Sequence, residues 1–240
     1  LPNRLFDAAA RRSSVRRSSA FRYVMNAPRP RSRCGKGTAT RMLRYVESLE
    51  PKYALVGRAL LLRAVIADHA IGTYARIHDM LLRARASKHA LRRLWLSSTS
   101  KRGKRETSVR RRRVAAMQRA ACHACDALLS HFSGCVRPRC PAWRRFRARV
   151  ERGETIAALR HAHEAYLDTM ARGCFVRVDA VADAVRRYFA CVASFCDAAM
   201  AEDEGVIRSS SLELRESLLA LRAFDALEGV FPEFSMGNNK

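Results

Sequence analysis

Four cysteines lie close together in the middle of the sequence. Cys122 and Cys125 are separated by two residues, and Cys135 and Cys140 are separated by four. Four thiolates suit the tetrahedral coordination of a structural zinc ion. The first pair, however, falls one turn apart inside a predicted helix, whereas the second pair flanks a turn that contains Pro138. We therefore expect buried or unreactive thiols and no metal, with a metal-dependent helical domain as the weaker alternative.

A second candidate for chemistry comprises His161, His163 and Glu164. The zinc-protease helix needs a second histidine four residues after the first, in the pattern H-E-x-x-H. Leu167 stands at that position. His161 and His163 also point to different sides of a helix, because residues two apart do not share a face. His163 continues an apolar stripe, so we expect a hydrogen-bonded core histidine there.

The short sequence Gly35-Lys36-Gly37-Thr38 has the residue types of a phosphate-binding loop. A P-loop also requires a glycine further upstream, a strand before it and a helix after it, and the sequence indicates none of these. No Ser-His-Asp or Cys-His spacing can be singled out either. The sequence therefore predicts a protein that is not an enzyme and that binds no cofactor.

Charge is distributed unevenly along the 240 residues. Lys and Arg outnumber Asp and Glu by 36 to 7 in residues 1–150, whereas they are outnumbered by 10 to 15 in residues 151–240. A positive field favours acidic partners of every kind, including nucleic acid and acidic proteins. Arginines outnumber lysines by 40 to 6, a pattern that biased codon usage also produces, so the charge is weak evidence for function.

Two basic segments are predicted to lie outside the packed core. Residues 1–44 hold two Arg-Arg-Ser-Ser repeats and predict a disordered basic arm, and residues 97–112 predict a basic insertion between helices. Such segments allow weak, nonspecific nucleic-acid binding through displaced phosphate counterions. A basic helical nucleic-acid-binding protein is therefore the alternative function. Whether the repeats are phosphorylated stays open.

The remaining sequence has a helical pattern almost everywhere. Apolar residues recur at intervals of three and four, as they do on one face of an amphipathic helix. We expect an all-α domain over residues 45–233, built as a bundle of long antiparallel helices, with a tail at 234–240. No alternating strand pattern is visible. The predicted helices begin near Leu55, Asp68, Ser108, Pro141, Ile156, Val178 and Ser210, the last with Glu213 in capping-box spacing.

The sequence also favours a cytosolic protein. The eight cysteines are scattered through apolar segments and no secretory signal is visible, which predicts reduced thiols. The most apolar stretch, residues 54–66, is interrupted by Arg58 and Arg63. It is shorter than the roughly 18 apolar residues that a membrane span needs. We therefore expect no membrane span.

Two segments of the sequence resemble the gamma-tubulin complex component family. In the first, an apolar segment is followed by a helix of the form Y-x2-[IV]-[FH]-x2-L-L-x-[RK] that ends in L-x3-W. The matching residues are Tyr74, Ile77, His78, Leu81, Leu82, Leu91 and Trp95, with Arg83 one position before the basic position of the pattern. The second resembles the family pattern H-x2-Y-L followed by C-F, in the family's order, with His163, Tyr166, Leu167, Cys174 and Phe175.

The resemblance implies an all-α C-terminal domain that binds gamma-tubulin and assembles with other gamma-tubulin complex components. The implied role is microtubule nucleation at a microtubule organising centre or spindle pole, in the cytoplasm and on the cytoskeleton. The motif residues are expected to be structural, and the residues that contact gamma-tubulin are not indicated. The family member, the ring geometry and the presence of an N-terminal domain elsewhere also stay open.

Overall fold

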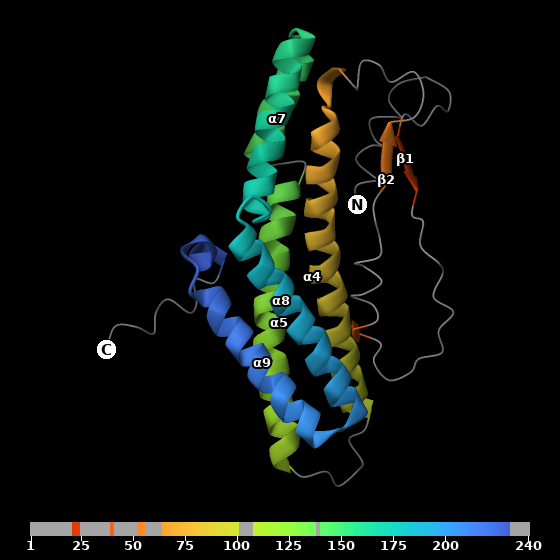
Figure 1. Ribbon diagram of the computed structural model, residues 1–240, viewed down its shortest axis with the longest axis vertical. Coiled ribbons are helices and arrows are strands. Elements are labelled where there is room, and N and C mark those ends of the chain that lie inside the picture. The colour runs from red at the N-terminus through yellow and green to blue at the C-terminus, as the bar shows by residue number, and fades with distance from the viewer. Residues whose placement is uncertain are drawn as a thin grey trace.

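Helices make up almost all of the protein that the computed structural model describes (Figure 1), namely residues 21–24, 39–40, 52–55, 64–100, 108–137 and 140–230. The all-α class predicted from the sequence is confirmed. The helices are α4 (Asp68–Ser100), α5 (Ser108–Val136), α6 (Pro141–Glu151), α7 (Ile156–Gly173), α8 (Asp179–Ala201) and α9 (Glu204–Arg222), followed by the 3-10 helix η1 (Asp225–Val230).

The long helices α4 and α5 pack side by side in opposite directions. The side chain of Gln118 on α5 donates a hydrogen bond to the carbonyl of Leu91 on α4 (3.0 Å), and the Cys125 thiol donates to the carbonyl of Ala84 (3.4 Å). Positions later in α5 thus meet positions earlier in α4. This is the antiparallel pairing that the sequence pattern predicted for neighbouring helices.

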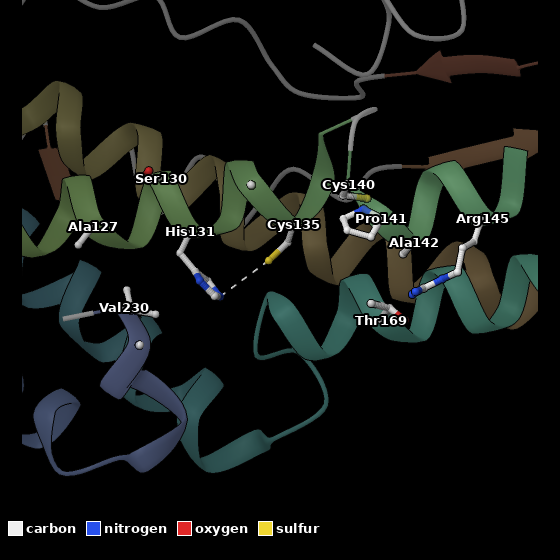
Figure 2. Close-up of a pocket in the computed structure, with 12 residues that line it drawn as sticks. Ala127, Ser130, His131, Cys135, Cys140, Pro141, Ala142, Arg145, Thr169 and Val230 are labelled. Atoms are coloured by element: carbon white, nitrogen blue, oxygen red, sulfur yellow. Dashed lines mark hydrogen bonds between the residues drawn. The ribbon is translucent and has the colours of Figure 1, made fainter. Parts of the chain in front are cut away.

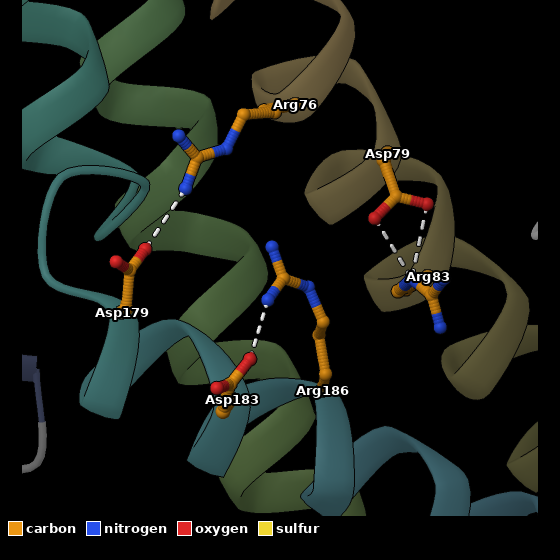
Figure 3. Close-up of polar contacts among 6 residues, drawn as sticks. All are labelled: Arg76, Asp79, Arg83, Asp179, Asp183 and Arg186. Atoms are coloured by element: carbon orange, nitrogen blue, oxygen red, sulfur yellow. Dashed lines mark hydrogen bonds and ion pairs between the residues drawn. The ribbon is translucent and has the colours of Figure 1, made fainter. Parts of the chain in front are cut away.

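Helices α4 and α8 run in the same direction. Near the start of both helices, Arg76 bonds to Asp179 (3.1 Å), and further along both, Ala86 and Ala193 pack together. Figure 3 shows the Arg76–Asp179 contact bridging the two helices, beside local pairs within each helix. Arg76 and Asp179 are both exposed, so this ion pair contributes at most about 1 kcal/mol. Apolar packing must therefore hold α4 against α8.

The core centres on α8, which lies between α4 and α9 (Figure 1). Tyr188 is fully buried, and its hydroxyl donates a hydrogen bond to the Ala121 carbonyl of α5 (2.7 Å). The buried residues of α8 keep the intervals of three and four seen in the sequence, and include Val181, Val185, Tyr188, Val192 and Phe195.

Local sequence accounts for several helix ends. Pro141 occupies the first turn of α6, as expected, where its missing N–H is not needed. Asp203 caps α9 by accepting a hydrogen bond from the Val206 N–H (3.1 Å). The predicted start of this helix at Ser210 was wrong. The Ser210 hydroxyl instead donates to the Val206 carbonyl (2.7 Å), one turn back within the helix.

The turn between α7 and α8 has an unusual backbone. The Val176 N–H bonds to the Ala171 carbonyl (2.8 Å) and the Phe175 N–H to the Arg172 carbonyl (2.9 Å), which is the hydrogen-bond pattern of a Schellman turn. Phe175 takes the left-handed position, with φ of 58°, where glycine is usual. A side chain there costs roughly 1–2 kcal/mol, which the packing of Phe175 must offset.

Two short strands correct the expectation that the protein has none. Strand β1 (Phe21–Val24) pairs antiparallel with β2 (Lys52–Leu55), with Tyr23 opposite Tyr53. Leu55 was predicted to begin a helix but ends β2. Both segments are rich in aromatic and aliphatic residues that suit strands, but their pairing joins positions about thirty residues apart, beyond the reach of a local pattern. Residues 39–40 of the predicted arm are also described, and the N–H groups of Ala39 and Thr40 donate hydrogen bonds to the Asp197 carboxylate of α8 (2.9 and 2.8 Å). The rest of the arm, and the tail at 234–240, lie outside the described residues.

The predicted basic insertion at 97–112 is also shorter than expected, because α4 extends to Ser100 and α5 begins at Ser108. Ser98 and Thr99 lie in the last turn of α4, where their hydroxyls donate hydrogen bonds to the carbonyls of Trp95 (2.7 Å) and Leu96 (2.9 Å). Residues 101–107 lie outside the described ranges.

Removing one large side chain from the α8 core should destabilise the whole domain. Phe195 is 0% exposed, so Phe195→Ala is expected to lower the free energy of unfolding by about 3–5 kcal/mol. Leu212→Ala is the matched control, because Leu212 is 57% exposed on α9, and should change stability by no more than about 0.5 kcal/mol. Urea unfolding followed by circular dichroism measures both. Equal losses in the two variants would contradict the central position of α8.

Candidate functional site

The two motif segments meet between α4 and α7. The hydroxyl of Tyr74 on α4 lies 3.0 Å from Nε2 of His163 on α7, within hydrogen-bonding distance, and their ring centroids are 6.0 Å apart. These two residues are 89 positions apart in the sequence. The structure therefore joins at one point two motifs that the sequence shows separately.

Aromatic side chains of α6 cover this junction. Phe146 stacks on Tyr166, with ring centroids 5.7 Å apart and planes 9° apart, and it meets His163 edge-on at 5.7 Å. Trp143 lies 5.5 Å from Tyr166. Such pairs add about 0.5–1.5 kcal/mol each beyond the area that they bury. The short helix α6 thus closes the site by aromatic packing.

Burial sets the charge state of the Tyr74–His163 pair. His163 is 3% exposed, and burial lowers its pKa below the ordinary value. Burial also raises the pKa of Tyr74. Both groups are therefore neutral near pH 7. Nδ1 of His163 has no hydrogen-bond partner in the part of the chain that the structure describes. A neutral pair packed among rings can fix two helices, but it presents no nucleophile or charge.

The other motif positions divide into buried residues and one exposed residue. Leu81, Leu82 and Tyr166 are half-buried, and the fully buried positions are Ile77, Leu91, Leu167, Cys174 and Phe175. Trp95, by contrast, is 56% exposed, and the adjacent Leu96 is exposed with it. Trp95 is thus the motif side chain most available to another molecule.

The four cysteines considered for zinc do not form one group. Cys125 is buried against α4, and burial raises the pKa of its thiol to about 12. Cys140 instead caps α6, accepting a hydrogen bond from the Trp143 N–H (3.4 Å). Among the described residues, no three His, Cys, Asp or Glu side chains converge in an arrangement that could hold a metal ion.

Sequence reasoning missed the cavity beside Cys135. This space, about 700 Å³, lies between α5, α6, α7 and η1 and is lined by His131, Cys135, Cys140, Arg145, Thr169 and Val230, among others (Figure 2). The Cys135 sulfur lies 3.8 Å from His131 Nε2. That contact had a signal in the sequence, because residues four apart share a face of a helix.

One family model matches the sequence, described as gamma tubulin complex component C-terminal, and the match covers residues 59–232. This range includes every helix from α4 to η1. The chain belongs to the gamma-tubulin complex component family. Comparison with curated proteins gave no match. The family is one of structural components of a complex, and the alternative of a nucleic-acid-binding protein gains no support from the comparisons.

The described helices also bear on the membrane question. None of them carries an apolar stretch of the length needed to cross a bilayer.

Stability should depend on pH through His163. The unfolded chain binds a proton at the ordinary histidine pKa of about 6.5, whereas burial lowers the pKa of His163 in the folded protein. Unfolding therefore takes up a proton as pH falls below that value. The free energy of unfolding should fall between pH 7 and pH 5, by at most about 1.4 kcal/mol per pH unit for this group.

His163→Gln should flatten this dependence, while retaining a side chain that can hydrogen-bond to Tyr74. His78, whose pKa is also lowered by burial, is present in both proteins, so the difference between them isolates His163. Urea unfolding at several pH values provides the measurement. Identical pH slopes in the two proteins would show that His163 takes up no proton on unfolding.

Proposed function

We propose that this chain binds gamma-tubulin as a component of a gamma-tubulin complex and so supports microtubule nucleation, without catalysing a reaction. The observation that carries the proposal is the family match over residues 59–232, which coincides with the helical bundle. The proposed setting is the cytoplasm, at microtubule organising centres, with other complex components as further partners.

The bundle supports such a role through rigidity. The start of α4 is tied to α7 by the Tyr74–His163 contact, and the middle of α4 packs on α5 and α8. A rigid domain can hold gamma-tubulin in one orientation. Several such domains, each holding one gamma-tubulin and arranged in a ring, would present a preformed first layer of a microtubule. This arrangement reduces the entropy that tubulin subunits lose when they assemble freely.

The exposed end of α4 is our candidate for a gamma-tubulin contact. Trp95 and Leu96 are exposed there, and Val109 is exposed at the start of α5. Tryptophan is enriched among the residues that contribute most to protein interfaces. Exposed basic side chains adjoin these residues in the sequence, at Arg92, Arg111 and Arg112, and such charges would raise the rate of association with an acidic partner.

Direct binding is tested by mixing the full chain with gamma-tubulin at about 0.2 M salt, where the Debye length is under roughly 10 Å and long-range attraction is screened. We expect the two proteins to co-elute on a sizing column, because contacts between packed apolar faces survive that salt. A folded chain that elutes separately from gamma-tubulin would contradict the proposal.

The contact at α4 is tested by Trp95→Ala. We expect this variant to bind gamma-tubulin at least about tenfold more weakly, which corresponds to 1.4 kcal/mol or more. Leu219→Ala is the matched control, since Leu219 is 53% exposed on α9, away from this end of the motif. Weaker binding by Leu219→Ala alone would move the contact to α9, and unchanged binding by both would exclude both faces.

A further inference from the structure

Two cysteines from different parts of the chain lie close together beside the cavity that Figure 2 shows with Cys135 in its lining. Cys135 belongs to the last turn of α5, and Cys174 is the residue that ends α7. The Cys135 sulfur packs against Gly173, the residue that precedes Cys174, which places the two thiols next to each other. Cys135 is half-buried and lines the cavity, whereas Cys174 is 0% exposed. A small molecule in the cavity can therefore reach Cys135 but not Cys174.

The backbone holds these two sulfurs in place. A Cβ atom added to Gly173 would lie only 2.6 Å from the Cys135 sulfur, so that sulfur rests directly against the glycine. The Schellman turn fixes Cys174 next to it, and Phe175 stacks on His131 with ring centroids 5.1 Å apart. The end of α5 and the end of α7 are thus locked together around the thiol pair.

The surroundings favour the thiolate form of Cys135. Its interactions with Cys174 and with His131 lower the pKa of Cys135, while the interaction with Cys135 and burial raise the pKa of Cys174. Contact with Cys135 in turn raises the pKa of His131, which also lies 2.8 Å from the Gly173 carbonyl oxygen. Cys140 and the cationic Arg145 line the same cavity, and no carboxylate is among the described lining residues.

We infer that Cys135 and Cys174 form a redox-sensitive pair, in which Cys135 reacts with hydroperoxides and Cys174 then closes a disulfide. A thiolate that is accessible and lies beside a second, resolving thiol is the arrangement found in redox-sensor cysteines. This inference does not depend on gamma-tubulin binding, because it rests only on contacts within the chain.

The chemistry proceeds in two balanced steps. The Cys135 thiolate attacks one oxygen of hydrogen peroxide, the O–O bond breaks, and hydroxide leaves, which takes a proton from the medium to become water. Cys135 is then a sulfenic acid. The Cys174 sulfur attacks the Cys135 sulfur, the S–O bond breaks, and the Cys174 proton leaves with the hydroxyl as a second water. Two thiols are oxidised, and one peroxide is reduced.

The first experiment measures the reactivity of Cys135 with iodoacetamide in the reduced full chain. We expect Cys135 to be alkylated at pH 6.5 at least about tenfold faster than an ordinary thiol, since a larger thiolate fraction outweighs its lower intrinsic nucleophilicity. Cys122 is the internal control, because it is half-buried on the same helix and burial raises its pKa. In His131→Gln, the rise of the Cys135 alkylation rate with pH should shift to higher pH.

The second experiment treats the full chain with hydrogen peroxide, blocks the remaining thiols and maps the products by peptide mass spectrometry. The expected product is a Cys135–Cys174 disulfide that dithiothreitol reverses. Cys174→Ala should stop at a sulfenic acid on Cys135, which dimedone labels, and Cys135→Ser should give neither product. Cys122→Ala, the matched control, should still form the disulfide.

Two results would overturn the inference. One is alkylation of Cys135 no faster than that of Cys122 at pH 6.5. The other is oxidation of the folded wild-type chain without a Cys135–Cys174 link, or with a link that forms only after the helical signal in circular dichroism has been lost. Folding of each variant is checked by the same signal, so a failure to fold is distinguishable from a loss of reactivity.

Discussion

The burial of α8 is the constraint on which the rest of the structure depends. This helix is apolar on most of its circumference, so it must be covered by several partners at once. Helix α9 covers one side as the second arm of a hairpin, α4 covers another, and Tyr188 reaches α5 through its hydroxyl. This requirement fixes which faces of α4, α5 and α9 turn inward, since each must present an apolar stripe to the same central helix.

The turn before α8 connects this core to the Cys135–Cys174 pair, and α7 connects it to the Tyr74–His163 contact. Phe175 adopts a left-handed backbone that disfavours its side chain, yet it is buried and packs against both His131 and Phe132. That packing fixes the direction in which α8 leaves α7, and it also places Cys174 beside Cys135. Near the middle of α7, the Tyr74–His163 contact joins the helix to α4. Helix α7 and the turn after it therefore connect the core to α5 through Phe175 and to α4 through His163.

The intervals of three and four in the sequence predicted the helices α4 to α9, because an amphipathic stripe is a local property, but they also predicted a helix from Leu55, where β2 ends. The buried state of His163 could be predicted in the same way. The strand pair β1–β2 and the contact between Cys135 and Cys174 could not, because each depends on residues far apart in the chain. The capping box at Ser210 failed for a different reason: two residues at the right spacing occurred inside a helix, where the serine bonds back to the preceding turn. Spacing identifies a cap only where the helix has been shown to begin.

Burial also distinguishes the motif residues that pack inside the bundle from those that are available to a partner. Most motif residues are buried or half-buried, so the motifs chiefly specify how α4 packs on α7 and how α7 ends. A motif of this kind identifies the family through its fold and cannot by itself identify the surface that meets a partner. Trp95 differs because its exposed side chain contributes little to the packing of its own helix. Cys174 is fully buried like Ile77 and Leu91, but its neighbour Cys135 lies outside the motif. The chemistry proposed for this pair thus depends on the approach of Cys174, a motif residue, to Cys135 on α5, a helix that carries no motif residue.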